Sequence, residues 1–313
     1  MKGRRRARGV ALITAMLITA ITGSLAAGLA WDNALDVRRT MVLLFHEQGF
    51  QVALGAESWI RNILRDDGID SPTDHLGELW ASDLPGLPVD NDSVQGAVVG
   101  NIEDLQGRFN VNNLIDANGE VDPDVLEQFQ RLLVILEIDP RFAGLAADWI
   151  DADQDAGFPD GAEDSIYTGL IPPYRTLNRS LTNVTELAAL EGMDPASMKV
   201  LLPHVTALPR GTQINVNTAT PVVLQSLDAN LDVSAIEGLL SQREEAGFAD
   251  YAQTFSTLVT NPAMFAQITE TSSYFQLKAV VQIDTVRVTY YSVLSRSPNG
   301  GPVTTILRSL GTI

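Results

Sequence analysis

The chain of 313 residues contains no cysteine and only three histidines. Without cysteine, disulfide frameworks, thiol catalysis and cysteine metal sites are excluded. The histidines, His46, His75 and His204, are scattered, and His46-Glu47 is not followed by a second histidine at the spacing of a zinc protease. The sequence also lacks a G-x-S-x-G nucleophile elbow and a phosphate-binding loop. We therefore expect a protein that is not an enzyme.

Positive charge is scarce outside the first nine residues. The chain has 21 Lys and Arg against 39 Asp and Glu, a formal net charge of −18. Five basic residues precede Val10, so the chain without residues 1–9 has 16 basic residues and a net charge of −23. Such a surface repels nucleic acid and anionic lipid, and it suits a domain that collects cations.

Charge is absent from Val10 to Ala30, and proline is absent before Pro72. The uncharged apolar run is long enough to cross a bilayer as a helix, which needs about 20 residues. The basic block before it should remain in the cytoplasm, which puts the rest of the chain across the membrane. Apolar residues continue at helical spacing as far as Ile63. We expect one helix from Val10 to about Asp66, roughly 85 Å long at 1.5 Å per residue.

Three kinds of amino-terminal segment could carry this run. One is a secretory signal peptide cut near Gly28-Leu29-Ala30, and a second is a permanent membrane anchor. The third is a type IV pilin-like leader, cut on the cytoplasmic side after Gly9, which leaves the apolar segment on the mature protein. The third fits best, because the apolar run is longer than the usual core of about 7–15 residues and continues as a helix.

The order of sequence patterns predicts an α+β protein. Residues 68–92 are rich in Pro, Gly and Asp and indicate a loop, and residues 94–111 indicate short strands around a turn at Gly100-Asn101. Helical patterns dominate from 123 to 204. Residues 274–283, 286–294 and 303–310 are typical of an antiparallel meander. We expect a long helix packed on an antiparallel sheet, with a helical domain inserted between the first strands and the last.

A weak internal repeat lies within the expected insert. Residues 109–112 and 214–217 both read apolar-Asn-Val-Asn, and each precedes a helical stretch. Two similar helix entries and a duplicated module explain this equally well, because Asn favours caps and turns.

Seven acidic residues and no basic one lie between Asp148 and Asp164. The alternation of Asp151, Asp153 and Asp155 has the spacing of a calcium loop. The segment departs from an EF-hand, since Ala156 holds the usual glycine place and Glu163 falls one residue beyond the twelfth position. The alternative is a solvated acidic loop. Repulsion among the carboxylates would oppose a compact loop without a cation, so we expect structural calcium.

A second oxygen-rich cluster comprises Asp116, Asn118, Glu120 and Asp122, which alternate around Gly119. It could bind a second cation. A turn followed by a helix cap explains it more simply, and we favour that interpretation.

Several short motifs together resemble one known family. They are Arg8-Gly9 before Val10-Ala11-Leu12-Ile13, then residues 109–114, 147–153, 173–174 and 215–219. In this order they are similar to the K-class minor pseudopilin of the bacterial type II secretion system, over nearly the whole chain. The resemblance implies a pilin-like long helix on an antiparallel sheet, with a large inserted helical domain that is SAM-like or helix-hairpin-helix-like.

The resemblance also implies how the protein is processed and placed. Prepilin peptidase would cleave after Gly9, and the new amino terminus, Val10, would be N-methylated. The mature chain would cross the bacterial inner membrane once, in contact with its lipid, with the carboxy-terminal domain in the periplasm. Calcium would bind in the helical domain, through Asp151, Asp153, Asp155, Glu163 and Asp164.

The family's function is assembly. The resemblance implies a minor pseudopilin at the tip of the pseudopilus that starts assembly with the I- and J-class minor pseudopilins and the major pseudopilin. It would thereby help export folded proteins across the outer membrane. The fifth mature position, where most pilin-like subunits carry glutamate, is Thr14. A buried unpaired carboxylate is costly in a membrane, so a subunit with no neighbour ahead of it should lack one.

Two rival functions agree less well with the sequence. A minor pilin of a type IV pilus, acting in adhesion or assembly, is opposed by the large insert and the absent glutamate. A membrane-anchored DNA receptor is indicated by helix-hairpin-helix resemblance over residues 214–248. Its expected hairpin, residues 227–232, has no glycine to bring backbone amides to phosphate and carries two acids. We therefore expect no nucleic acid partner.

These expectations divide the chain into five parts. They are the leader at 1–9, the transmembrane part of the helix at 10–31, the first part of the pilin-like domain at 32–111, the inserted helical domain at 112–270, and the carboxy-terminal meander at 271–313.

Overall fold

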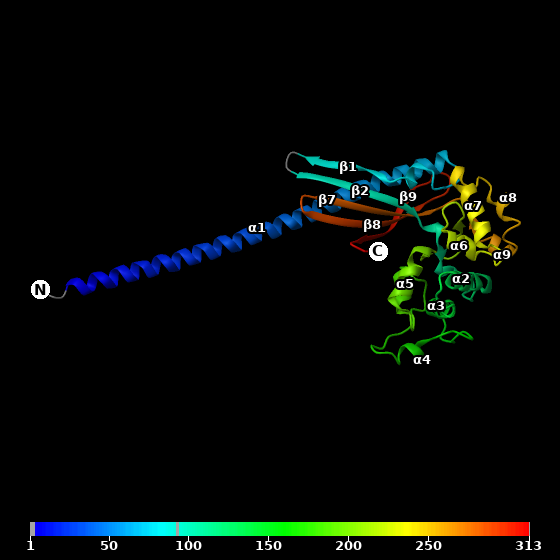
Figure 1. Ribbon diagram of the computed structural model, residues 1–313, viewed down its shortest axis with the longest axis horizontal. Helices are drawn as coiled ribbons and strands as arrows, with labels where there is room; N and C mark the ends of the chain where they lie inside the picture. The colour runs from blue at the N-terminus through cyan, green and yellow to red at the C-terminus, as the bar shows by residue number, and fades with distance from the viewer. Residues whose placement is uncertain (1–3, 92–93, 313) are drawn as a thin grey trace.

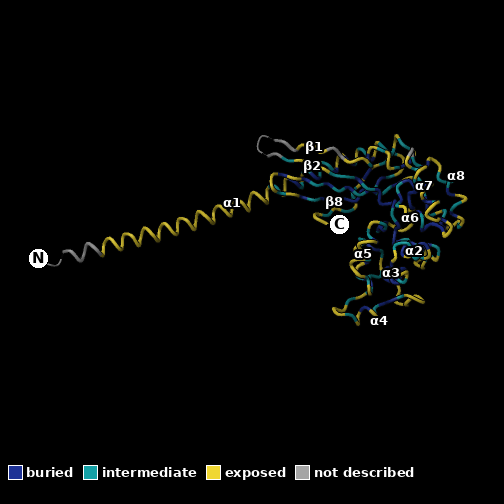
Figure 2. Tube along the Cα trace, in the orientation of Figure 1, coloured by how far each residue is buried: buried dark blue, intermediate teal, exposed yellow. Residues whose placement is uncertain are grey.

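The structure is a computed structural model that describes residues 4–91 and 94–312. Its first element is a single helix, α1 (Arg4–Asp70), whose amino-terminal part extends away from the rest of the molecule (Figure 1). From Val10 to Leu44 every residue of α1 is exposed, and burial begins at Phe45 (Figure 2). By length and composition, α1 is able to cross a membrane. The prediction of one uninterrupted helix is confirmed.

The body contains a five-stranded antiparallel sheet in the order β1-β2-β7-β8-β9. Its strands are β1 (Leu84–Asn91), β2 (Val94–Asp104), β7 (Tyr274–Ile283), β8 (Val286–Arg296) and β9 (Val303–Leu310). The carboxy-terminal meander is confirmed. The β2–β7 pairing joins segments that lie on opposite sides of the insert in the sequence.

Two sequence-based expectations for the first strands were wrong. β1 lies within the segment expected to be a loop, because Pro85 and Pro88 are tolerated on an edge strand. No turn interrupts β2 at Gly100-Asn101. Gly100 instead allows the close approach of β7, since a Cβ there would lie 2.5 Å from the carbonyl oxygen of Lys278.

The second half of α1 packs across one face of this sheet. The strand residues that face it alternate along β7, as period-two side-chain geometry requires, and they are Phe275, Leu277, Ala279, Val281 and Ile283. On the helix, Ala53, Ile60 and Leu64 complete this core. The close fit includes Gly49, where an added Cβ would lie 2.9 Å from Val288 Cγ2.

Between β2 and β7 the chain forms the insert, which has its own hydrophobic core. Its helices are α2 (Pro123–Ile135), α3 (Phe142–Ile150), α4 (Asp164–Tyr167), α5 (Pro195–Leu201), α6 (Pro221–Ser226), α7 (Val233–Ala246), α8 (Tyr251–Phe255) and α9 (Pro262–Phe265). Short 3-10 helices are η1 (Leu79–Ala81), which precedes the insert, and η2 (Leu105–Gly107), η3 (Val111–Leu114), η4 (Val184–Ala189) and η5 (Leu202–His204). Phe109 and Val111, expected in the pilin-like part, pack in the insert core.

The two copies of the repeat form the same local structure. β3 (Phe109–Asn110) pairs in parallel with β4 (Val205–Thr206), and β5 (Ile214–Asn215) pairs in parallel with β6 (Ile268–Thr269). In each copy the first Asn side chain accepts a hydrogen bond from the backbone N–H of the second Asn. Each second Asn, Asn112 or Asn217, is buried and bonds to the backbone of a distant segment. The pattern thus builds two equivalent anchors of the insert.

Candidate cation site and domain junction

The acidic segment of the insert brings three carboxylates together. Asp151 ends α3, and Glu163 directly precedes α4. With Asp153 they offer oxygen atoms that all lie within 4.8 Å of one another. Asp151 is 6% exposed and Glu163 is 2% exposed, whereas Asp153 is exposed.

The two buried carboxylates have oxygens without a donor. Asp151 Oδ1 and Glu163 Oε1 are buried and make no hydrogen bond. Burial, followed by the charge of Asp153, raises the pKa of Asp151 to about 7. Burial also raises the pKa of Glu163 to about 6, against a hydrogen bond from Thr176. A buried carboxylate without a compensating charge is unfavourable, so a cation would stabilise the ionised forms.

Asn178 was missed by sequence reasoning. Its backbone has a positive φ of 49°, its N–H donates to the Trp149 carbonyl, and its Nδ2 donates to the Asp153 carbonyl at 2.7 Å. Its Oδ1 is buried without a hydrogen-bond partner. Asn178 Oδ1 is therefore a further neutral oxygen ligand available beside the acidic loop. Nothing in the sequence marks it, because it lies far from the alternating acids along the chain.

The remaining acids of this segment have other surroundings. Asp164 accepts hydrogen bonds from the N–H and Oγ1 of Thr176, and it forms an ion pair with Arg175 at 3.4 Å. Asp155 is exposed, and its backbone N–H donates to Asp153 Oδ1. Neither carboxylate belongs to the close group of three. Asp148 is buried and shapes the loop by accepting from the N–H of Gly157 at 2.9 Å.

The second cluster is a turn followed by a helix cap, as favoured from the sequence. Asp116 Oδ1 accepts from the backbone N–H groups of Asn118 and Glu120 at 2.8 and 3.0 Å. Asp122 accepts from the first N–H groups of α2, with Pro123 at the first helical position. These carboxylates satisfy local backbone donors.

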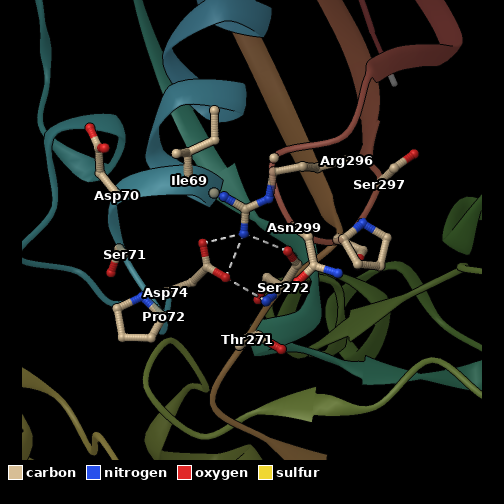
Figure 3. A pocket seen from close by; sticks show the side chains of 14 residues that line it. Ile69, Asp70, Ser71, Pro72, Asp74, Thr271, Ser272, Arg296, Ser297 and Asn299 are labelled. Carbon is tan, nitrogen blue, oxygen red and sulfur yellow. Dashed lines mark hydrogen bonds and ion pairs between the residues drawn. The ribbon is translucent and has the colours of Figure 1, made fainter.

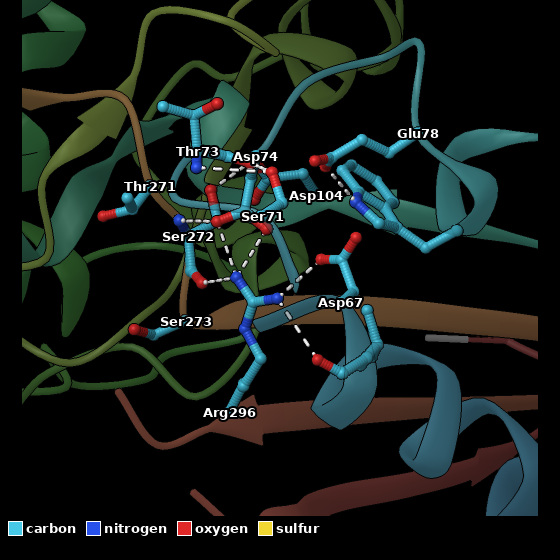
Figure 4. Close-up of polar contacts among 12 residues, drawn as sticks. Asp67, Ser71, Thr73, Asp74, Glu78, Asp104, Thr271, Ser272, Ser273 and Arg296 are labelled. Atoms are coloured by element: carbon cyan, nitrogen blue, oxygen red, sulfur yellow. Dashed lines mark hydrogen bonds and ion pairs between the residues drawn. The ribbon is translucent and has the colours of Figure 1, made fainter. Parts of the chain in front are cut away.

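A buried arginine joins the end of α1 to the sheet. Arg296, at the end of β8, is 7% exposed and donates to Asp67 at 2.8 Å and to Asp74 at 2.5 and 2.6 Å (Figure 4). It also donates to the carbonyl oxygens of Leu64 and Ser272. One side chain therefore links α1, the loop after it, and the segment through which the insert returns to the sheet.

A buried carboxylate at the end of β2 completes this junction. Asp104 Oδ2 accepts from Ser272 Oγ at 2.6 Å, from Thr218 Oγ1 at 2.5 Å and from Asn215 Nδ2 at 3.2 Å. Burial raises the pKa of Asp104 to about 6. The residue where the chain enters the insert thus bonds to both the interior and the exit of the insert.

A polar pocket of about 560 Å³ opens beside Arg296 (Figure 3). Its wall includes Ser71, Thr271, Ser297 and Asn299. The nearby carboxylates of Asp67, Asp74 and Glu78 also lie close together. Each of these three carboxylates has a donor, from Arg296 or, for Glu78, from the Trp80 indole N–H at 2.7 Å. Unlike Asp151 and Glu163, none of the three has a buried oxygen that lacks a hydrogen-bond partner. This junction is stabilised by the protein itself.

The predicted processing site lies in the first turns of α1, which contain Gly9 and Val10. Thr14, at the fifth position after the expected cleavage, directs its hydroxyl to the carbonyl oxygens of Val10 and Ala11 at 3.1 and 3.0 Å. Its polar group is therefore satisfied within the helix.

A long apolar helix whose second half packs on an antiparallel sheet defines a pilin-like subunit, and the domain inserted between β2 and β7 distinguishes its class. The family models described as "Type II secretion system (T2SS), protein K" match residues 107–210 and 214–271. The chain belongs to this family, and it is a minor pseudopilin of the type II secretion system.

Individual relatives support this assignment over nearly the whole length. The type II secretion system protein K of Pseudomonas aeruginosa is 36% identical over 310 residues, covering 95% of this chain and 91% of the relative. That of Aeromonas hydrophila is 30% identical, covering 95% of both. The fold is similar to a chain in the crystal structure of the GspK-GspI-GspJ complex from enterotoxigenic Escherichia coli. The TM-score is 0.75 at 24% identity, over 88% of this chain and 100% of that one.

Proposed function

We propose that this minor pseudopilin occupies the tip of the pseudopilus. There it initiates assembly with the I- and J-class minor pseudopilins and the major pseudopilin, and it helps export folded proteins across the outer membrane. The observation that carries the proposal is the position of the insert. It covers the end of the body at which α1 finishes, and Asp104 and Arg296 hold it there (Figure 1). A further subunit stacked on that end would meet the insert.

Thr14 supports the same position. A glutamate placed there would enter the membrane without a neighbouring amino terminus to neutralise it. We expect Thr14→Glu to lower secretion of exoproteins at least tenfold in cells, and Thr14→Val to have no effect. Secretion at the wild-type level by Thr14→Glu would remove this support for the tip position. Co-purification of the tagged chain with the I- and J-class subunits tests the partners directly, as the related complex contains GspI and GspJ.

The proposed membrane arrangement follows from α1. Prepilin peptidase cleaves after Gly9, Val10 is methylated, and the body lies in the periplasm while α1 remains in the inner membrane. Intact mass and amino-terminal sequence of the protein, from membranes with and without prepilin peptidase, test this arrangement. The expected product starts at methylated Val10 only when the peptidase is present. A start near Trp31 would mean an ordinary signal peptide and would contradict the proposal.

We further propose that the insert binds structural calcium. Asp151, Asp153 and Glu163 supply the charged oxygens, and the unpaired Oδ1 of Asn178 is a candidate fourth ligand. The support is the pair of buried carboxylate oxygens without donors, because calcium takes carboxylate and amide oxygens as ligands. Asp155 and Asp164 belong to the wider set expected from the sequence.

Melting of the full-length protein in detergent, in excess calcium and in chelator, tests the calcium site. We expect calcium to raise the melting temperature, and we expect Asp151→Asn and Asn178→Ala to reduce this rise. Asp155→Asn and Asp164→Asn decide whether the outer acids take part. An identical melting temperature in calcium and chelator would refute the site.

The finer architecture of the insert fits a helix-hairpin-helix scaffold that does not bind DNA. In the segment between α6 and α7, Asp228 accepts from the N–H and Oγ1 of Thr260, and Asp232 caps α7. Both acids of the hairpin therefore have structural partners within the insert. A salt-sensitive shift of DNA by the purified protein would contradict this proposal.

A further inference from the structure

The hydroxyl of Thr176 lies between two carboxylates of the acidic segment. Thr176 Oγ1 is 3.1 Å from Glu163 Oε2 and 3.1 Å from Asp164 Oδ1. A hydroxyl has one proton and can donate it to only one of these oxygens at a time. The carboxylate that gains most from this proton is therefore decided by burial and by the other donors that each carboxylate has.

Asp164 already has donors of its own. The backbone N–H of Thr176 donates to Asp164 Oδ1 at 3.0 Å, and Arg175 forms an ion pair with Asp164 Oδ2 at 3.4 Å. Glu163 is also the more deeply buried of the two, since it is 2% exposed while the side chain of Asp164 is 23% exposed. The Thr176 hydroxyl therefore stabilises the charge of Glu163 more than that of Asp164, because water cannot replace a donor at a buried oxygen.

This hydrogen bond gives the two oxygens of Glu163 different surroundings. Oε2 has the Thr176 hydroxyl as its donor, whereas Oε1 is buried without a hydrogen-bond partner. Rotation of the carboxylate would break the bond to Thr176. The hydroxyl therefore holds Glu163 in an orientation that leaves Oε1 available to a cation, in the group that Glu163 forms with Asp151 and Asp153.

The segment that carries Thr176 is itself attached to the acidic loop. Gln154 Nε2 donates to Thr176 Oγ1 at 3.4 Å. Two residues after Thr176, Asn178 Nδ2 donates to the carbonyl oxygen of Asp153 at 2.7 Å. Residues 176–178 thus bond both to the carboxylate that precedes α4 and to the loop that follows α3, so they connect the two sides of the candidate site.

We propose that Thr176 is a positioning residue of the calcium site. Its hydroxyl keeps one oxygen of Glu163 free for the ion, and Asp164 acts through the backbone of Thr176 and not as a ligand. Ligands of bound metals are commonly held by such hydrogen bonds, and the loss of one typically weakens metal binding about 10- to 100-fold. This role rests on the calcium site proposed above.

Calorimetric titration of the full-length protein with calcium, in detergent and at one pH, tests this role. Thr176→Val keeps the shape of the side chain and removes the hydroxyl, whereas Thr176→Ser keeps the hydroxyl. We expect Thr176→Val to raise the calcium Kd at least about tenfold, and Thr176→Ser to stay within about threefold of the unaltered chain. Thr182→Val, at an exposed position of the same insert, is the matched control and should leave the Kd unchanged. Cooperative melting in chelator checks that each variant is folded, and Thr176→Ala takes the place of a valine variant that is not.

A double-mutant cycle separates positioning from a general effect on the fold and from direct contact of the hydroxyl with the ion. In a Glu163→Ala background the carboxylate that Thr176 holds is gone, so Thr176→Val should cause no further loss of calcium affinity. A further tenfold loss in that background would refute the positioning role.

The indirect role of Asp164 has its own test. Asp164→Asn retains an oxygen that can accept from the Thr176 N–H, so it should weaken calcium binding less than Asp151→Asn does. An equal loss would make Asp164 a ligand and contradict its indirect role.

Failure of the positioning role is distinguishable from failure of the site. No calcium binding by the unaltered chain would refute the calcium site itself. Calcium binding with the same Kd by Thr176→Val and the unaltered chain would leave the site in place and overturn the role of Thr176.

Discussion

At the residue scale, one buried carboxylate attaches α1 to the sheet. Glu57 of α1 is 1% exposed and accepts hydrogen bonds from Arg308 at 2.8 and 3.0 Å, from Thr305 at 2.7 Å and from Tyr290. Burial by itself would raise the pKa of Glu57, but these hydrogen bonds lower it to about 2. Glu57 is therefore ionised and bonded to two strands throughout the physiological range.

We expect Glu57→Gln to destabilise the protein by about 2 kcal/mol, because it removes charge-assisted bonds and leaves Arg308 without its partner. Thermal or denaturant unfolding in detergent measures this change. Glu47→Gln, at an exposed position of the same helix, should have little effect. Equal stability of the two variants would show that the Glu57 cluster does not hold α1 on the sheet.

The raised pKa of Asp67 predicts an unusual pH dependence of the protein's stability. Burial, and then the charges of Glu78 and Asp74, raise the pKa of Asp67 from 3.8 to about 7. A raised pKa means that the folded state binds the proton more tightly. The resulting stabilisation is complete below the ordinary pKa and is lost as the pH rises through about 7.

Melting temperatures between pH 4 and pH 8 test this effect. We expect Asp67→Asn to show a smaller loss of stability with rising pH than the unaltered chain, because the amide does not ionise. Asp66→Asn, at an exposed neighbouring position, should leave the profile unchanged. If the melting temperatures of Asp67→Asn and the unaltered chain changed in parallel with pH, the raised pKa of Asp67 would be contradicted.

At the element scale, the two halves of α1 lie in different surroundings. Residues 10–31 carry no charge and are exposed in the isolated chain, while the second half of the helix buries one face against β7 and β8. The change from an exposed helix to one packed on the sheet occurs near Gly49, which lies directly against Val288. Glycine is unfavourable within a helix, so its presence here indicates close packing rather than flexibility.

Two glycines of α1 provide a matched test of that packing. Gly49→Leu should destabilise the protein by about 1–3 kcal/mol, because the larger side chain overfills the contact with β8. Gly55→Ala should stabilise it by about 0.5–1 kcal/mol, because nothing lies within 4 Å of an added Cβ and alanine favours the helix. Denaturant unfolding measures both changes. Stabilisation by both substitutions would mean that α1 does not approach the sheet at Gly49.

At the scale of the whole molecule, two hydrophobic cores share one polar junction. One core lies between α1 and the sheet, and the other lies within the insert. Asp104, Arg296 and their partners link them, with a small third cluster of Leu105, Leu208 and Val293. The proposed calcium site belongs to the insert core alone, beside buried Ile150 and Ala162.

This separation predicts a local response to calcium. Hydrogen exchange of the full-length protein should slow at least tenfold for amides of residues 148–180 when calcium is added. Amides of β7 and β8 should exchange at the same rate with and without calcium, since their hydrogen bonds lie in the other core. An equal slowing of both regions would mean that the two cores unfold as one unit.

The outline of the fold could be predicted from the sequence because it depends on local patterns. An uncharged run without proline determines α1, period-two alternation determines β7 to β9, and Asp122-Pro123 determines the start of α2. The family could be recognised for the same reason, since its motifs are short and retain their order. The acidic loop could also be identified, although not which of its carboxylates meet.

Other features were decided only by tertiary contacts. β1 forms because an edge position tolerates its prolines, and Phe109 joins the insert core because β3 pairs with a strand far away in sequence. Asn178 reaches Asp153, and Arg296 reaches Asp74, across long stretches of chain. Local composition therefore determined the helix, the meander and the excess of acid. Only the folded chain decided which oxygens lack a donor, because that depends on which distant segments come together.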